Sequence, residues 1–574
     1  MKLPGMKINP ELEKLYKSRG DWTEDTLLTR FERSVQNFGD REFVVDDLGR
    51  RYTYKEMDQY SDKVAAVLYD YGVREGSMVT YQITPRSEFV AVMLACFKLG
   101  AISAPLGMFF ENEGLHDITA FLGSNLHISV AKYRGRDRGG MIEESLAGVL
   151  SPRKIILVGE SRTAPELVCL EELLMQNLPV PPRYKGTGTD LSTILCTSGT
   201  TSMSKGVMLT NDNIIFSEDG FNKELGLTEE DIMFMPAPLN HATGYHHGII
   251  SPMLRGGKVV LQERFCCVDA IHLMNKEKVT YSMGATPFIY DLVAQLDICG
   301  EKLPYLRFYI CGGAPVPEFL VNKAFNKHGI LVCECYGSTE SVPHLYVRPS
   351  EALDVHGRWS GRAMGGIEVR IVDAKHNEVP RGTVGEEVSR GPSVFVGYYK
   401  NEEATEKALD DNGWCYSGDL CITDENDNVK VVGRIKDVII RGGENLNANE
   451  IDSNLEGCPG IKDHAIVGRP EERLGERICA FIVCEPGQQP TKEDILEYLK
   501  SKRVPKRLWP EFVEYIDEIP RTDSGKVQKF KLDKVLRSRM GLTGDHPSIT
   551  AGVGAEEHGF NSCTRSLHRI GDLK

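Results

Sequence analysis

Strand-length apolar runs alternate with helix-length segments in two stretches of this chain, and this alternation limits the possible folds more than any other feature. The first stretch covers residues 78–132 and the second covers residues 258–335. Such alternation is typical of parallel strands whose crossover helices cover the faces of a sheet. We therefore expect an α/β fold in which two doubly wound subdomains, with mixed or parallel sheets, share one large body.

The same patterns predict the individual elements. In the first stretch we expect strands over 78–84, 101–106 and 126–132 and helices over 87–99 and 114–122. In the second we expect strands over 258–261, 279–283, 306–311 and 330–335 and helices over 268–276, 286–296 and 317–328. Because ligands of such sheets bind beyond the carboxyl ends of the strands, residues that directly follow strands are the first candidates for a site.

Beyond about residue 380 the pattern changes to short β runs separated by glycines, which predicts a small β-barrel-like part. These runs are 385–389, 395–399, 414–417 and 429–432. The segment 435–540 has strand and helix patterns of its own, and about a hundred residues are enough for a small α+β domain. The polar, aperiodic segment 541–574 is expected to be disordered. We therefore divide the chain into domains at 1–434 and 435–540, followed by this tail.

Charge and cysteine usage exclude several classes of protein. A net charge of −14 on 574 residues argues against a nucleic-acid-binding surface. The N-terminus lacks an apolar signal, and the longest apolar run, 89–97, is too short to cross a bilayer. We therefore expect a cytoplasmic protein without an integral membrane segment. The 15 cysteines form no C-x-x-C pair, so the ligand spacing of a structural zinc site is absent.

One loop, residues 197–206 (TSGTTSMSKG), has the composition of a phosphate-binding site. It lies between two β-type runs, 192–196 and 207–210, and offers many backbone N–H groups, hydroxyls and the cation Lys205. It is not a Walker loop, because Ser204 stands at the second glycine position and Gly206 follows the lysine. Taken alone, the loop is equally compatible with an ordinary surface loop.

Four other motifs accompany this loop in order along the chain. They are Tyr336-Gly337-Ser338-Thr339-Glu340, Tyr416-Ser417-Gly418-Asp419, Gly433-Arg434 and Pro520-Arg521-Thr522-Asp523-Ser524-Gly525-Lys526. Three of them have ordinary structural explanations: a helix start for Glu340, a turn cap for Asp419 and a solvated surface lysine for Lys526. Together and in this order, they resemble the adenylate-forming superfamily of acyl-CoA synthetases, adenylation domains and luciferases. The resemblance extends from about residue 26 to 536.

The resemblance implies a role for each matching residue. It implies catalytic roles for Lys526, Glu340, Thr200 and His241, with Glu340 also a Mg²⁺ ligand. It implies nucleotide or CoA contacts for Thr197, Ser198, Gly199, Thr201, Lys205, Gly312, Gly313, Ala314, Tyr336, Gly337, Ser338, Thr339, Asp419, Arg434, Lys436, Gly442, Gly443 and Glu444. In this assignment Lys436 is the hinge of a mobile C-terminal domain that carries Lys526.

The implied reaction is the two-step activation of a carboxylic acid. The acid and ATP would give an acyl-adenylate and pyrophosphate, and CoA would then give acyl-CoA and AMP, with ATP, Mg²⁺ and coenzyme A as the cofactors. The phrases around His241 and residues 283–288 resemble those of bacterial short-chain acyl-CoA synthetases and of cyclohexanecarboxylate–CoA ligases. They favour a short- or medium-chain fatty acid in a pocket walled by Tyr245, His246, His247, Ala285 and Gly312.

Several alternatives stay open at this point. The acid could be alicyclic or aromatic, and the acyl group could pass to the phosphopantetheine of a carrier protein instead of CoA. A luciferase-type oxygenation and a non-catalytic homologue are further alternatives. The sequence also allows a homodimer.

The phosphate loop departs from the family pattern at two positions. Ser202 stands where the family usually has glycine, and Ser204 stands where it usually has proline. Serine restricts a backbone that needs positive φ and relaxes one that proline would fix. We expect a loop of reduced rigidity that keeps its chemistry.

Overall fold

The computed structural model describes residues 3–197, 205–313, 316–355, 357–441, 444–471, 473–522 and 525–541. The predicted tail beyond residue 541 and most of the phosphate loop lie outside these residues. The chain divides into two compact units. The body unit comprises Met1–Val369 and Ser389–Tyr416, and the C-terminal unit comprises Arg370–Val388 and Ser417–Lys574. The sequence-based division after residue 434 stays a prediction.

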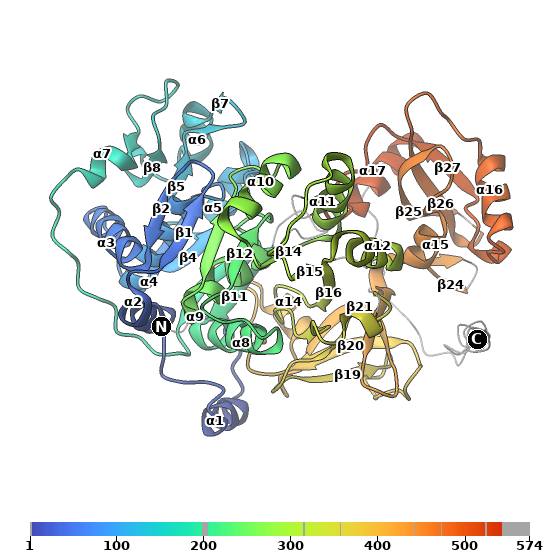
Figure 1. Ribbon diagram of the computed structural model, residues 1–574, viewed down its shortest axis with the longest axis horizontal. Coiled ribbons are helices and arrows are strands. Elements are labelled where there is room, and N and C mark those ends of the chain that lie inside the picture. Colours follow the sequence, from blue (N-terminus) through green and yellow to red (C-terminus); the bar gives the residue numbers. More distant parts are fainter. Residues whose placement is uncertain are drawn as a thin grey trace. The chain divides into compact units, whose positions relative to one another are not determined.

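The first sheet of the body unit has nine strands in the order β18-β17-β16-β15-β14-β12-β13-β1-β2 (Figure 1). Its strands are β1 (Glu42–Asp46), β2 (Arg51–Thr53), β12 (Ile232–Met235), β13 (Lys258–Leu261), β14 (Tyr281–Gly284), β15 (Phe308–Gly312), β16 (Leu331–Tyr336), β17 (Leu345–Tyr346) and β18 (Arg362–Ala363). From β16 to β1 all pairs are parallel. Helices α10 (Cys267–Glu277), α11 (Thr286–Cys299) and α12 (Glu318–His328) pack on one face through a core of their own.

The second sheet has seven strands in the order β11-β10-β4-β3-β5-β8-β9. Its strands are β3 (Met78–Gln82), β4 (Ile102–Pro105), β5 (Leu126–Val130), β8 (Ile155–Val158), β9 (Val168–Cys169), β10 (Leu191–Cys196) and β11 (Gly206–Thr210). All pairs are parallel except β10–β11, which is the hairpin around the phosphate loop. The order shows the doubly wound pattern, since β4 and β5 lie on opposite sides of β3.

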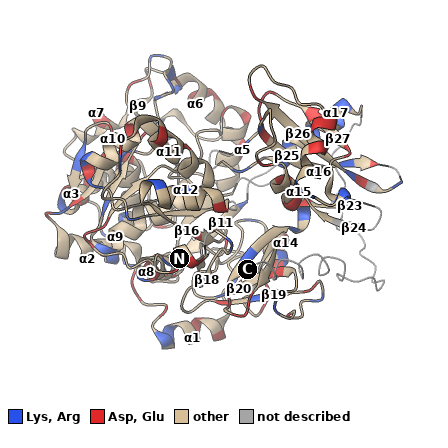
Figure 2. Cartoon of the chain, turned by 45° about the vertical axis from the view of Figure 1, so that its right-hand side comes forward, with Lys and Arg blue, Asp and Glu red and all other residues tan. Residues whose placement is uncertain are grey.

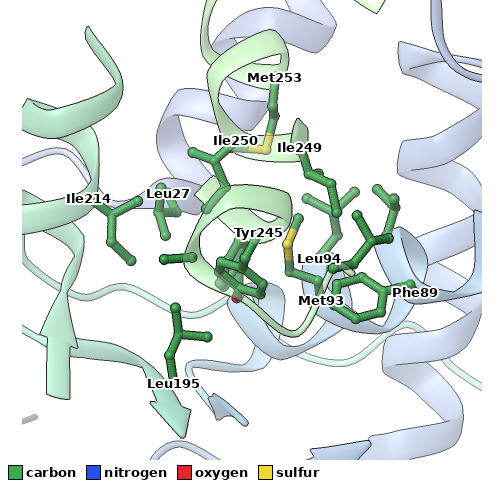
Figure 3. Packing of buried hydrophobic residues seen from close by; sticks show 14 of the residues in the cluster. Leu27, Phe89, Met93, Leu94, Leu195, Ile214, Tyr245, Ile249, Ile250 and Met253 are labelled. Atoms are coloured by element: carbon green, nitrogen blue, oxygen red, sulfur yellow. The ribbon is translucent and has the colours of Figure 1, made fainter. Parts of the chain in front are cut away.

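Helix α4 (Ser87–Leu99) belongs to a core that contains residues of both sheets. All thirteen of its residues are buried, which follows from a sequence that is apolar on every side. Figure 3 shows Phe89, Met93 and Leu94 of this helix beside Tyr245 and Ile249. Its one charged residue in the last turn, Lys98, is 1% exposed and bonds the carboxylates of Asp58 and Asp62 at 2.7 and 2.6 Å.

The alternation predicted from the sequence is confirmed by both sheets. The predicted helix over 87–99 is α4, and the predicted strand over 258–261 is β13. Most other predicted elements differ from the observed ones by one to three residues at their ends, but the predicted run over 414–417 is only the start of a longer strand, β21 (Cys415–Thr423). The predicted strand over 395–399 is wrong, because in that segment only Tyr398 makes a β-bridge, with Val207. Its backbone is held instead by separate bonds to the body, such as Phe395 N–H to the Glu340 carbonyl at 2.7 Å.

The C-terminal unit contains most of a four-stranded sheet with the order β19-β20-β21-β22 and a five-stranded sheet. The first comprises β19 (Glu368–Val372), β20 (Gly385–Arg390), β21 (Cys415–Thr423) and β22 (Val429–Arg434). The second comprises β23 (Val438–Arg441), β24 (Glu444–Asn447), β25 (Ile461–Glu471), β26 (Gly475–Cys484) and β27 (Phe512–Tyr515). Helices α15 (Ala448–Asn454), α16 (Lys492–Ser501) and α17 (Lys529–Arg539) pack on it and close two small cores.

The distribution of charged residues and the character of the helices can be compared with the composition. Figure 2 shows acidic and basic residues interspersed along the chain, whose net charge is −14. In the part of the chain that the structure describes, none of the helices combines the length and the apolar character needed to cross a membrane.

The buried carboxyl of Asp212, at the start of α8 (Asn211–Glu224), has hydrogen-bond partners, within the described part of the chain, for only one of its two oxygens. Asp212 is 2% exposed, its Oδ1 accepts the Thr23 N–H at 3.0 Å, and its Oδ2 has no hydrogen-bond partner among the described residues. Burial raises the pKa of Asp212 to about 7. Since the unfolded carboxyl ionises near its ordinary value, ionisation of Asp212 opposes folding increasingly as the pH rises from about 4 to about 7.

We predict that Asp212→Asn raises stability at pH 8, by about 1–3 kcal/mol, and changes it little at pH 4. Asparagine keeps the acceptor for the Thr23 N–H and removes the buried charge. Denaturant unfolding of both proteins between pH 4 and pH 8 measures the difference. An exposed carboxyl of α14 (Glu402–Ala408), changed by Glu406→Gln, serves as the control and should give a flat difference. A flat difference for Asp212→Asn as well would contradict the prediction.

Candidate active site

Predicted site residues follow four neighbouring parallel strands of the nine-stranded sheet, at the edge where these strands end. Strands β12, β14, β15 and β16 are adjacent, and their carboxyl ends lead to His241, Ala285, Gly313 and Glu340. Parallel strands end at the same edge, so these segments lie along one line beyond the sheet. The order of the strands therefore brings together motifs that are far apart in the chain.

The glycine that ends β15 is required by close packing. Gly312 pairs with Cys335 of β16, and a Cβ on Gly312 would lie 2.6 Å from the Cys335 Sγ. Any side chain there would separate the two strands at the point where Tyr336 follows. Gly312 thus fixes the spacing between the predicted adenine-lining segment and the predicted stacking ring. Of that segment, Ala314 lies outside the described residues.

The motif that ends in Glu340 forms a compact turn after β16. The Ser338 hydroxyl accepts the backbone N–H groups of Glu340 and Ser341 at 3.2 and 3.3 Å. The half-buried Tyr336 ring meets His344 edge-on, with the ring centres 5.6 Å apart. Gly337 and Thr339 complete the turn. Its hydrogen bonds hold the predicted stacking ring and the predicted metal ligand in one rigid segment.

The two ends of the phosphate loop are paired, as expected for a β-hairpin. The Thr197 N–H bonds the Lys205 carbonyl at 3.0 Å, and Cys196 pairs with Gly206. Both ends leave the second sheet at the carboxyl end of β10. The predicted residues Ser198, Gly199, Thr200 and Thr201, and the two unusual serines Ser202 and Ser204, lie outside the described residues.

One residue that the sequence did not single out connects Lys205 to Glu340. The Tyr398 hydroxyl donates to Glu340 Oε1 at 2.6 Å, and Lys205 Nζ lies 4.5 Å from the centre of the Tyr398 ring. Burial and the neighbouring Glu340 raise the pKa of Tyr398, so its hydroxyl stays a donor. Tyr398 thus contacts a carboxylate through its hydroxyl and an ammonium group through the face of its ring. The only signal in the sequence was a pair of tyrosines in a segment predicted as a strand.

The donor set at Glu340 suits the predicted metal. Mg²⁺ prefers hard oxygen ligands and is usually held by one or two carboxylates together with substrate phosphates and waters. Glu340 provides such a carboxylate close to Lys205 at the end of the predicted phosphate loop. No cluster of three or more histidine, cysteine or acidic side chains suited to a metal occurs among the described residues, so a site made by protein ligands alone is not the arrangement found there.

His241 leads directly into a π-helix, η2 (Thr243–Ile250), which the sequence did not reveal. Its ring Nδ1 lies 3.2 Å from the Thr243 hydroxyl, and its carbonyl accepts the Tyr245 N–H at 2.8 Å. Burial, with the nearby His247 and His241, lowers the pKa of His246 well below its ordinary value. The predicted pocket residues Tyr245, His246 and His247 are all fully buried in this helix. Short π-helices occur frequently at functional sites.

The predicted ribose contacts meet within the C-terminal unit. Asp419 of β21 pairs with Arg434 of β22, and Arg434 Nε donates to Asp419 Oδ1 at 2.6 Å. The Asp419 side chain is 8% exposed, and its backbone N–H bonds the Ser417 hydroxyl at 3.1 Å. The carboxylate and the guanidinium therefore position each other before any ligand is present. Neighbouring Lys436 lies in a single turn of 3₁₀-helix, η3 (Ile435–Asp437).

The predicted catalytic lysine closes a tight turn before α17. The Lys526 N–H bonds the Thr522 hydroxyl at 3.1 Å, and the Thr522 N–H bonds the Lys526 carbonyl at 2.8 Å. Glu444 forms ion pairs with Arg441 and Arg507 at 3.1 and 3.3 Å, while Gly442 and Gly443 lie outside the described residues. These residues belong to the C-terminal unit, whereas Glu340 and Lys205 belong to the body unit.

The chain is similar to known proteins along most of its length. A family model for an AMP-binding enzyme matches residues 31–399, and one for an AMP-binding enzyme C-terminal domain matches residues 450–526. The chain is 35% identical to a medium-chain fatty-acid–CoA ligase of Escherichia coli, over 93% of this chain and 94% of the relative. It is 28% identical to a 4-coumarate–CoA ligase of Narcissus pseudonarcissus, over 88% and 92%. Among solved structures, ATP-bound MatB of Rhodopseudomonas palustris matches with a TM-score of 0.78 and 26% identity, covering 90% of this chain and 100% of that one.

We predict that Tyr398→Phe weakens binding of ATP in the presence of Mg²⁺ about 3- to 10-fold, because Glu340 loses a hydrogen bond of ordinary strength that orients it. Calorimetric titration of both proteins measures the change. Tyr399→Phe is the matched control: this neighbouring hydroxyl bonds the Leu122 carbonyl at 3.3 Å and not Glu340. Equal losses in the two variants would show that the Tyr398–Glu340 bond has no special part in binding.

Proposed function

The chain belongs to the AMP-binding enzyme family, and on that premise we propose that it activates a short- or medium-chain fatty acid. As an AMP-forming acyl-CoA synthetase, it joins a carboxylic acid to CoA at the expense of ATP, which becomes AMP and pyrophosphate. The similarity to a medium-chain fatty-acid–CoA ligase over nearly the whole chain supports the choice of acid.

The proposed nucleotide site rests on the contacts that Tyr398 makes with Lys205 and Glu340. Lys205 contacts the face of the Tyr398 ring and Glu340 accepts a hydrogen bond from its hydroxyl. Lys205 lies at the end of the predicted phosphate loop, and Glu340 lies in the turn that follows Tyr336. This arrangement suits a nucleotide whose base stacks on Tyr336 and whose phosphates lie along the loop. Mg²⁺, when bound, neutralises phosphate charge and polarises the phosphoryl oxygens.

The first half-reaction needs cations where two anions meet. The substrate carboxylate attacks the α-phosphorus of ATP, an acyl phosphate bond forms and pyrophosphate leaves. In our proposal Lys526 bridges the carboxylate and the α-phosphate as a cation and takes up no proton, while Lys205 holds the departing phosphates. Asp419, oriented by Arg434 at 2.6 Å, accepts the ribose hydroxyls.

The second half-reaction needs a different set of groups around the same adenylate. The thiol of CoA attacks the acyl carbon, the thioester forms and AMP leaves with the electron pair of the broken C–O bond. We assign Lys436 as the hinge for a change of domain position and Gly442, Gly443 and Glu444 as the loop that then meets CoA. His241 lies at the carboxyl end of β12, where the acyl group and the thiol would meet. Such a rearrangement also protects the adenylate from water.

An aromatic or alicyclic acid is the second candidate substrate, favoured by the similarity to a 4-coumarate–CoA ligase. Acyl transfer to a carrier-protein phosphopantetheine is a second candidate for the final step. We also propose a cytoplasmic location and a homodimer, and sedimentation of the purified protein tests the latter.

An acid panel tests the proposed function. Pyrophosphate release with ATP and CoA is measured for straight-chain acids from acetate to dodecanoate, with benzoate and cyclohexanecarboxylate alongside. We expect a maximum among the short and medium chains and an acyl-CoA product. A maximum at benzoate or cyclohexanecarboxylate would select the second candidate, and release only with a carrier protein would replace CoA as the acceptor.

We predict that Lys526→Ala lowers the rate of adenylate formation about 100-fold or more, since it removes a cation that acts where charge develops. The same variant should still convert supplied acyl-adenylate and CoA to thioester at close to the normal rate. Single-turnover assays of the two half-reactions measure this. Lys531→Ala, which removes an exposed lysine of α17, is the control. Equal losses in both half-reactions would contradict the role assigned to Lys526.

We predict that Ser202→Gly combined with Ser204→Pro lowers the KM for ATP about 2- to 5-fold, because glycine permits positive φ and proline reduces the freedom of the free loop. Steady-state kinetics at saturating acid and CoA measure the change. The KM for CoA in the same variant is the internal control and should not move. An unchanged KM for ATP would show that the two serines leave the loop equally fit for phosphate.

A further inference from the structure

Three imidazole nitrogens in helix η2 are buried without a hydrogen-bond partner among the described residues. They are both ring nitrogens of His246 and Nε2 of His247. Both rings are 0% exposed. Unpartnered polar atoms of this kind are rare in folded proteins because each loses its bonds to water, so these nitrogens require a partner, either an ordered water or a ligand. Their place in a short π-helix, an element frequent at functional sites, favours a ligand.

Of the two rings, His247 is held in a defined orientation by helix α8. Its Nδ1 lies 2.9 Å from Glu218 Oε2, and its ring stacks on Phe221 with the centres 4.4 Å apart. Glu218 is itself fully buried, and its other oxygen accepts the Ser217 hydroxyl at 3.1 Å. The ring can therefore neither tilt nor exchange its two nitrogens without breaking the contact to Glu218.

This contact determines which nitrogen of His247 carries the proton. A carboxylate only accepts hydrogen bonds, so Nδ1 is the N–H donor toward Glu218. In the neutral ring, Nε2 is then a lone-pair acceptor, fixed in direction by the stacking on Phe221. An acceptor in these surroundings is satisfied by an O–H or N–H group and repels a carbonyl oxygen.

We propose that His247 Nε2 accepts a hydrogen bond from the acyl part of the substrate, so that the enzyme prefers acids with a hydroxyl or amine N–H on their tail to plain alkanoates. The inference rests on the proposed function, because η2 begins two residues after His241, at the carboxyl end of β12. Glu218 acts through His247 and is a positioning residue.

The surroundings of η2 make such a preference strong. Gly248 lies directly on β12, where a Cβ would come within 2.8 Å of the Met235 side chain. Tyr245 uses its hydroxyl internally, bonding the Ser103 hydroxyl at 2.8 Å. In Figure 3 the Tyr245 ring is surrounded by aliphatic and aromatic carbon. A donor on the substrate thus finds its acceptor at His247, and a site built for a donor rejects analogues that lack it.

The first experiment compares matched acids on the wild-type enzyme. Octanoate, octanoates hydroxylated at successive carbons and the corresponding oxo-octanoates are assayed for ATP- and CoA-dependent pyrophosphate release. We expect one hydroxylated isomer to exceed both octanoate and its oxo counterpart by about 10- to 100-fold in kcat/KM, as for one hydrogen bond in an apolar site. No preferred isomer, or a preference for an oxo acid, would overturn the proposal.

Two variants then test the residues. Glu218→Gln offers an amide that can donate to Nδ1 and so moves the ring proton to Nε2, and we expect the hydroxy-to-oxo ratio to fall about 10-fold or more. His247→Phe should abolish the ratio. Ser251→Ala, which removes a buried 2.7 Å bond to Asn222 of the same helix α8, controls for a general loss of packing and should keep the ratio. An unchanged ratio in Glu218→Gln and His247→Phe would overturn the assignment.

A spectroscopic measurement on the wild-type enzyme tests the proposal even if the variants fail to fold. The ¹⁵N spectrum of wild-type enzyme labelled at histidine, with the His247 signals assigned by difference from His247→Phe or from the Phe221 contact, should show the Nδ1–H tautomer. The Nε2 signal should shift when the preferred hydroxy acid is added. An Nε2–H tautomer, or no shift on addition, would contradict the proposal.

The outcomes separate this inference from the function on which it rests. If no acid, plain or substituted, releases pyrophosphate with CoA, both fail. If plain alkanoates are activated as well as every hydroxylated isomer, the ligase function stands and only the role of His247 is overturned.

Discussion

The shared core around helix α4 is the interaction on which the rest of the body unit depends. This helix is buried along its whole length in a core that takes residues from both sheets, so neither sheet can shift without exposing apolar surface. The single buried lysine near its end is neutralised by two aspartates, which keeps that core free of an unpaired charge. The parallel strands packed around it then present their carboxyl ends as fixed edges.

Those fixed edges explain how segments that are far apart in the chain come to lie near one another. Strand order, not sequence distance, sets which loops become neighbours, and β12, β14, β15 and β16 are adjacent. The hairpin β10–β11 and the bridge between Val207 and Tyr398 hold Lys205 within reach of Glu340. Asp419, Arg434 and Lys526 lie in the other compact unit.

Much of this arrangement could be predicted from the sequence, because apolar period and strand length report burial directly. Helix α4 and strand β13 were predictable to the residue since each is an apolar run with clear ends. Tyr398 was not, because its role comes from two contacts made across the fold and a tyrosine pair has no periodic signature. The π-helix was hidden for a related reason: its residues have no unusual composition, and the wider turn is seen only in the backbone of the folded chain. The roles of Lys526 and Lys436 rested on resemblance to a family, since a lysine in a turn is chemically unremarkable.

The wider turn of η2 also has a consequence for how this chain can change. A π-turn arises when one extra residue enters an α-helix, and each residue of an α-helix turns the side-chain direction by about 100°. Removing a single residue before His247 would restore an ordinary helix and rotate every preceding side chain of the turn to a new neighbour. We therefore expect a one-residue deletion to change this helix more than most substitutions would, because it would give the whole turn, which we propose to face the acid, a new set of neighbours while Ile249, Ile250 and the core beyond them stay in place.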